Sequence, residues 1–95
     1  MTAWDDLLES VDRYASAGVE IPGGTEEHLL DLVQRAMADR SIDTELHAPD
    51  VARWLVGLSL AHRAVRERSP QIDPDLDLAD LRLIITRWLH PARPR

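Results

Sequence analysis

One stretch of the sequence, residues 50–68, constrains the fold more than any other. At about 100° per residue, its apolar side chains cover nearly the whole circumference of a helix. A helix that is apolar all round must be surrounded, either by the rest of its own domain or by a partner. The stretch is therefore expected to be the central helix, and it is also the first candidate for an interface.

The size and composition of the chain indicate one globular domain. A chain of 95 residues builds a single core, and 44% hydrophobic with 29% charged residues is an ordinary globular composition. The absence of cysteine excludes disulfides and zinc–sulfur sites within the chain and suits a cytoplasmic location. No apolar run approaches the roughly 20 residues of a membrane span, and the N-terminal residues are too acidic for a signal peptide. We therefore expect a cytoplasmic domain without a membrane contact.

Charge is divided unevenly along the chain. The net charge of −6 argues against direct nucleic-acid binding. Residues 1–50 hold twelve acids and three arginines, giving −9, whereas residues 51–95 hold five acids and eight arginines, giving +3. The two halves can pack together within one domain, or they can complement one another between subunits.

Apolar residues recur at helical spacing in four segments, and no strand pattern is present. Thr2 and Thr25 are placed to cap the first two helices, and Pro49 suits the first turn of the third. Asp77 is expected to cap the fourth after a loop over residues 71–76. The prediction is an all-α, four-helix domain, orthogonal or bundle-like, over residues 1–92 with a disordered tail over 93–95; its helices are expected at 3–17, 25–40, 49–68 and 77–90.

Two residues of the 50–68 stretch do not fit simple core packing. Gly57 lies in the middle of the expected helix and costs roughly 1 kcal/mol against alanine, which is usually accepted where another helix approaches closely. His62 is a lone histidine among apolar residues. It is expected as a hydrogen-bonded core or interface residue, with a ligand-contacting or pH-sensing role as the alternative.

No convincing catalytic or metal-binding set is present. The four histidines lack the i, i+3 or i, i+4 spacing of a local metal site. The alternating aspartates of residues 73–77 open like an EF-hand loop, but Leu78 stands where glycine is needed and Ile84 where glutamate is needed. Ser59 and His62 share one continuous helix without a strained turn to present the hydroxyl. We therefore expect no enzyme activity, no cofactor and no metal.

Two segments, LLDLVQRAMADRSIDTELHAPDVARWLVGLSLAHRAV and DPDLDLADLRLIITRWL, are joined by a polar connector. Over about residues 29–90 this order of features resembles the C-terminal half of TetR-family transcriptional regulators. The resemblance implies an all-helical fold, dimerisation through the last two long helices, and an apolar effector pocket. The family's N-terminal helix-turn-helix domain has no counterpart here, so the resemblance does not extend to operator binding.

The resulting hypothesis is a non-enzymatic helical dimerisation or regulatory domain with a pocket for a small apolar ligand. The partner is expected to be a second copy or another protein. The alternative is a small monomeric adaptor that docks a larger partner through charge complementarity. The residues expected at the interface or pocket are Trp54, Leu58, Ala61, His62, Val65, Leu81, Ile84, Ile85 and Trp88.

Overall fold

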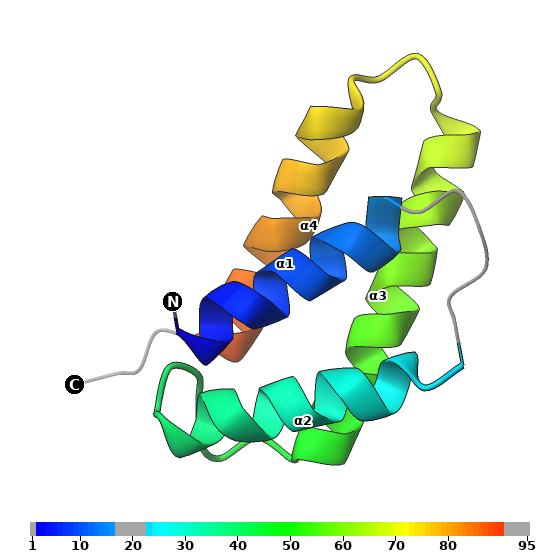
Figure 1. Ribbon diagram of the computed structural model, residues 1–95. Helices are drawn as coiled ribbons and strands as arrows, with labels where there is room; N and C mark the ends of the chain where they lie inside the picture. The colour runs from blue at the N-terminus through cyan, green and yellow to red at the C-terminus, as the bar shows by residue number, and fades with distance from the viewer. Residues whose placement is uncertain (1, 17–22, 91–95) are drawn as a thin grey trace.

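The computed structural model describes residues 2–16 and 23–90, which form four α-helices and no strand (Figure 1). The prediction of an all-α, four-helix domain is confirmed. The expected tail over 93–95, and residue 17 at the expected end of the first helix, lie outside the described residues. The helices are α1 (Ala3–Ser16), α2 (Thr25–Ala38), α3 (Ala48–Arg68) and α4 (Pro74–Leu89).

The two longest helices, α3 and α4, run antiparallel as a hairpin (Figure 1). α1 lies across both of them, and α2 crosses the N-terminal part of α3. α1 and α3 each contact all three of the other helices, and α3 has the more extensive contacts of the two within the described residues. The 50–68 stretch therefore forms the helix that packs most extensively against the others, as predicted for a central helix.

The core is built from one face of each helix and one residue of the loop after α2. In α1 and α2 the buried residues follow the i, i+3, i+4 spacing of an amphipathic helix, so each of these helices buries its single apolar stripe. The buried hydrophobic residues are Leu7, Val11, Ala15, Leu29, Leu32, Val33, Ala36, Ile42, Val51, Ala52, Leu55, Leu81, Ile85 and Leu89.

The first two helices begin in different ways. At α1, the Asp5 N–H donates to the Thr2 hydroxyl oxygen, and the Thr2 N–H donates to the Asp5 carboxylate, so the predicted threonine cap is confirmed. The expected cap at Thr25 is wrong. Thr25 is the buried first residue of α2, and Gly24 precedes it with a φ of 89° that favours glycine.

α4 begins at Pro74 rather than after Asp77. The Asp73 carboxylate accepts the Asp75 N–H at 2.9 Å, and Pro74 follows in the first turn. Asp77 is instead inside the helix and pairs with Arg66 of α3 at 2.7 Å. The local sequence around either aspartate is compatible with a helix cap. In the structure Asp73 is the cap, and the side chain of Asp77 binds Arg66 of α3.

An ion pair between Asp12 of α1 and Arg82 of α4 joins the acidic and basic halves of the chain. The Arg82 Nε–H also donates to the second Asp12 oxygen at 2.9 Å. This ion pair supports the first explanation of the charge division, in which the acidic and basic halves pack together within one domain.

Candidate interaction surface

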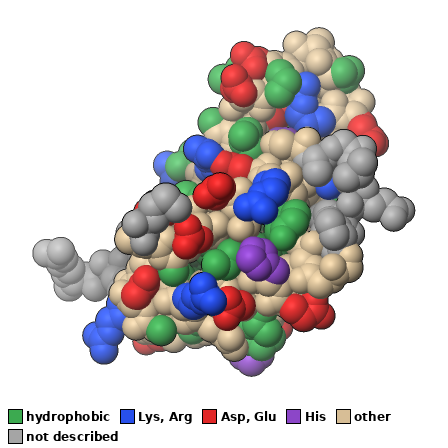
Figure 2. All heavy atoms as spheres, in the orientation of Figure 1, with side chains coloured by type: hydrophobic (Ala, Val, Ile, Leu, Met, Phe, Trp, Pro, Cys, Tyr) green, Lys and Arg blue, Asp and Glu red, His purple; other side chains and the backbone are tan. Residues whose placement is uncertain are grey.

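Exposed apolar residues are concentrated on the α3/α4 hairpin. Of seven exposed large hydrophobic residues in the described part of the chain, three lie on α3 and three on α4, and the seventh is in the loop that joins them. The face formed by α1 and α2 carries scattered charged side chains of both signs (Figure 2). Concentrated exposed apolar residues mark interaction sites on soluble proteins. The seven are Trp54, Leu60, Val65, Ile72, Leu76, Leu83 and Ile84.

A groove runs between α3 and α4 in two adjoining parts that share Leu58 and Ile84. Its first part has a volume of about 340 Å³ and is lined only by Trp54, Leu58, Ile84 and Trp88. Two of these side chains are largely exposed, Trp54 at 56% and Ile84 at 55%. This part of the groove can bind an apolar side chain or ligand, because no polar residue lines it.

The groove continues towards the loop of the hairpin as a second hollow of about 180 Å³. Ala61 and Val65 extend its apolar lining along α3, and Asp77 and Asp80 add acidic groups from α4. We call the whole region the α3/α4 surface; it is defined by Trp54, Leu58, Ala61, Val65, Ile84 and Trp88.

This surface exists because the other helices cover only one side of α3. The buried residues Val51, Leu55 and Ser59 repeat at a spacing of four and face the core. Trp54 and Val65 project from the flank of α3, about a quarter of a turn away from these residues and next to α4, and both are exposed. The expectation that α3 is surrounded is therefore met on one side only within the described chain.

The residues expected at an interface divide between this surface and the core. Six of the nine define the α3/α4 surface. The placement of Ile85 at an interface is wrong, because its side chain is fully buried in the core. Leu81 is 5% exposed; it lies at the floor of the groove and also belongs to the core. The apolar stripe of α4 is wider than one face, so neighbouring Ile84 points outward while Ile85 points inward.

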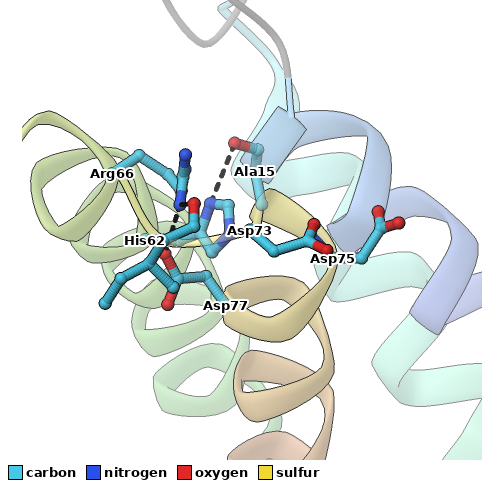
Figure 3. Close-up of polar contacts among 7 residues, drawn as sticks. Ala15, His62, Arg66, Asp73, Asp75 and Asp77 are labelled. Atoms are coloured by element: carbon cyan, nitrogen blue, oxygen red, sulfur yellow. Dashed lines mark hydrogen bonds and ion pairs between the residues drawn. The ribbon is translucent and has the colours of Figure 1, made fainter. Parts of the chain in front are cut away.

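The ninth expected residue, His62, connects α3 to the end of α1 (Figure 3). Its Nδ1 lies 3.2 Å from the backbone oxygen of Ala15, and the adjacent Arg63 donates to the backbone oxygen of Tyr14 at 2.8 Å. The last carbonyls of a helix have no partner within the helix, and polar or cationic side chains stabilise them. His62 therefore has a structural reason to interrupt the apolar pattern of α3. The expected alternative of a ligand or pH-sensing role stays untested.

Arg63 and Arg66 were not among the residues singled out from the sequence. Arg66 donates to the Asp77 carboxylate and to the backbone oxygen of Ile72, each at 2.7 Å, and so ties α3 to the beginning of α4. The partners of Arg63 lie 49 residues away along the chain. Contacts between residues so far apart in the sequence leave no local pattern. The sequence signal for them is limited to the group of arginines in the last turns of α3.

A cavity of about 360 Å³ lies where α1, α3 and α4 meet. His62, Arg63 and Arg66 line it together with Glu67 and Asp75. Three of these side chains already bind oxygens of the protein itself, as described above. We therefore interpret this cavity as part of the structural joint between the three helices.

Among residues 2–16 and 23–90, two exposed carboxyl groups have a lowered pKa, and both lie at helix ends. Hydrogen bonds from the backbone N–H and the hydroxyl of Thr2 lower the pKa of Asp5. Hydrogen bonds from the hydroxyl and the backbone N–H of Ser41 lower the pKa of Asp39. Hydrogen bonds to the charged form of a carboxylate favour that form. Both groups therefore belong to capping arrangements of the fold.

Across residues 2–16 and 23–90, no cluster of three or more His, Cys, Asp or Glu side chains is arranged to hold a metal ion. No helix in this part of the chain combines the length and apolar character needed to cross a membrane. Comparisons with protein families, with curated proteins and with solved structures find no match to this chain. We therefore infer the function from the residues and their geometry.

Proposed function

We propose that this chain is a non-enzymatic helical dimerisation domain that associates with a second copy through the α3/α4 surface. The observation that supports the proposal is the apolar groove with the exposed side chains of Trp54 and Ile84 at its edges. The regulatory role implied by the resemblance to TetR-type C-terminal halves is part of the same proposal. The small apolar ligand also belongs to this proposal, because a dimer would cover the groove and enclose an apolar pocket.

The energetics of association favour a symmetric contact. Full burial of a large apolar side chain is worth roughly 1.5–3 kcal/mol, and Trp54 and Ile84 have more than half of their surface still to bury. Association itself costs an estimated 4–15 kcal/mol or more. A twofold dimer uses every residue of the surface twice, so its apolar gain is doubled against that single cost.

Sedimentation equilibrium over the micromolar range tests the proposal. We expect the parent chain to approach twice its monomer mass of 10.7 kDa. The double variant Trp54→Ser/Ile84→Ser should remain near 10.7 kDa with an unchanged helical circular-dichroism spectrum, because both positions are exposed in the single chain. A parent chain that stays at 10.7 kDa at all these concentrations contradicts the proposal.

Leu83→Ser provides the matched control. Leu83 is also an exposed apolar residue of the hairpin, on α4, but it lies outside the α3/α4 surface. We expect this variant to dimerise like the parent. Equal loss of association in Leu83→Ser and in the double variant would show that general hydrophobicity, rather than this surface, drives the association.

The alternative of a monomeric adaptor that docks through charge has a weaker basis. Some of the opposite charges of the two halves bind one another, as Asp12 and Arg82 do. An adaptor of this kind would bind its partner less strongly as salt is added, because exposed charges are screened over about 10 Å at 0.1 M. Association of two copies through the apolar groove would instead depend much less on salt.

A further inference from the structure

The outer side of α3 carries a row of six exposed residues spaced alternately four and three apart. This is the spacing at which one face of a helix meets a second helix in a coiled coil. The row begins with an acid, continues with one large and three small side chains, and ends with a base. It adjoins the groove through Trp54 and consists of Asp50, Trp54, Gly57, Ala61, Ala64 and Arg68.

We infer that the partner on this face is α3 of a second copy, packed antiparallel in one register. The inference rests on the proposed function and specifies how its dimer is built. The register places Asp50 opposite Arg68 of the partner subunit, Trp54 opposite Ala64 of the partner subunit, and Gly57 opposite Ala61 of the partner subunit. Twofold symmetry repeats each of these pairs, so six positions form six contacts.

Charge selects the antiparallel orientation. A parallel pair would place Asp50 beside the partner's Asp50, and Arg68 beside the partner's Arg68. The antiparallel register places opposite charges together at both ends of the contact, and it also opposes the two helix dipoles. Asp50 is available for this role, because its contact with Arg53 within the chain is 3.5 Å long and both side chains are mostly exposed.

Side-chain size selects the same register. Trp54 is the largest exposed side chain on α3 and needs room in the partner, which alanine at position 64 leaves. A Cβ built at Gly57 meets no atom within 4 Å in the described chain, so packing within one copy does not explain this glycine. Its backbone does not require glycine either, since the only glycine with positive φ in the described chain is Gly24. The close helix approach expected at Gly57 is therefore assigned to the partner.

Charge reversal tests the register with substitutions at exposed positions. Asp50→Arg alone and Arg68→Asp alone each place like charges together at both ends of the contact. We expect each variant to raise the dimer Kd roughly three- to tenfold at low salt. The double variant Asp50→Arg/Arg68→Asp should restore the parent Kd to within about twofold. It swaps the two charges within every pair, so opposite charges again face one another.

Glu26→Arg is the control, because it makes the same change of charge at an exposed position of α2, away from the row. It should leave the Kd within about twofold of the parent. If the parent dimerises but the single charge reversals have no effect, or the double variant does not restore the Kd, the register is wrong while the proposed function stands. A monomeric parent chain overturns both.

Gly57→Leu tests the position of closest approach. Because a Cβ at Gly57 has open space around it, the single chain should fold normally and melt no lower than the parent. The larger side chain should separate the two helices and raise the dimer Kd at least tenfold. A folded Gly57→Leu chain with the parent Kd would contradict the inferred register.

Discussion

The helix pairs α1/α2 and α3/α4 use their apolar residues differently. α1 and α2 each have one apolar stripe, and all of the exposed large hydrophobic residues in the described chain lie outside these two helices. α3 and α4 bury one face in the same core but carry a second set of apolar residues to the surface. A helix with one apolar stripe can therefore bury all of that stripe within its own domain. A helix with a wider apolar surface still has a face that can be buried by a partner.

The largest contrast is expected between two neighbouring residues of α4. Ile85→Asp places a carboxylate in the core, where the parent side chain is 0% exposed, and should destabilise the fold by several kcal/mol. Ile84→Asp changes a residue that is 55% exposed, and should leave the monomer folded but abolish dimerisation. Urea unfolding and sedimentation of both variants measure the two effects. If both variants unfold, or both remain folded dimers, the division of α4 into a core face and an interface face is wrong.

A smaller effect is expected where the two regions are joined. Arg63→Ala removes the donor to the Tyr14 backbone oxygen and leaves a carbonyl at the end of α1 without this partner. We expect a loss of about 1–3 kcal/mol in the free energy of unfolding, measured by urea denaturation at a concentration too low for dimerisation.

Arg53→Ala is the matched control for this loss. Arg53 is an exposed arginine on the same helix, and its 3.5 Å contact with Asp50 is weak. Its replacement should change the free energy of unfolding by no more than about 0.5 kcal/mol. Equal losses in the two variants would mean that the joint between α3 and α1 contributes nothing beyond an ordinary surface arginine.

The smallest effect concerns acid stability at the end of α2. The pKa of Asp39 is lower in the folded chain than its ordinary value of 3.8, because Ser41 donates two hydrogen bonds to the carboxylate. These bonds therefore stabilise the fold above pH 3.8, and their contribution is lost as the pH falls through the lowered pKa. Asp39→Asn should flatten this part of the stability profile, measured by urea unfolding between about pH 5 and pH 2. Ser41→Ala should remove part of the same dependence, and a profile unchanged in both variants would contradict the assignment.

Much of the fold could be predicted from local sequence. The four helices follow from the apolar spacing, and the cap of α1 follows from Thr2 and Asp5. The beginning of α4 was predicted too late, although Asp73 followed by Pro74 is itself a local signal for a helix start. The pairing of Asp77 with Arg66 of α3 had no such local signal.

Part of the candidate surface could also be predicted, because residues 50–68 are apolar all round. The same property did not allow the core-facing side of the helix to be predicted, since apolar residues are present on nearly every side. Ile84 and Ile85 were equivalent in the sequence for the same reason. The crossing of α1 and α2 over one side of the hairpin decided that Ile85 is buried and that Ile84 and Trp54 are exposed.

The apolar spacing along the chain was enough to predict a small all-α domain with one helix that is apolar on nearly every side. The side of that helix that remains exposed, and the binding of His62 and Arg63 to the end of α1, follow from how the helices pack. The difference lies in the range of the interactions. Helix formation and capping depend on residues within a few positions of one another, whereas coverage of a face depends on the packing of segments far apart in the chain.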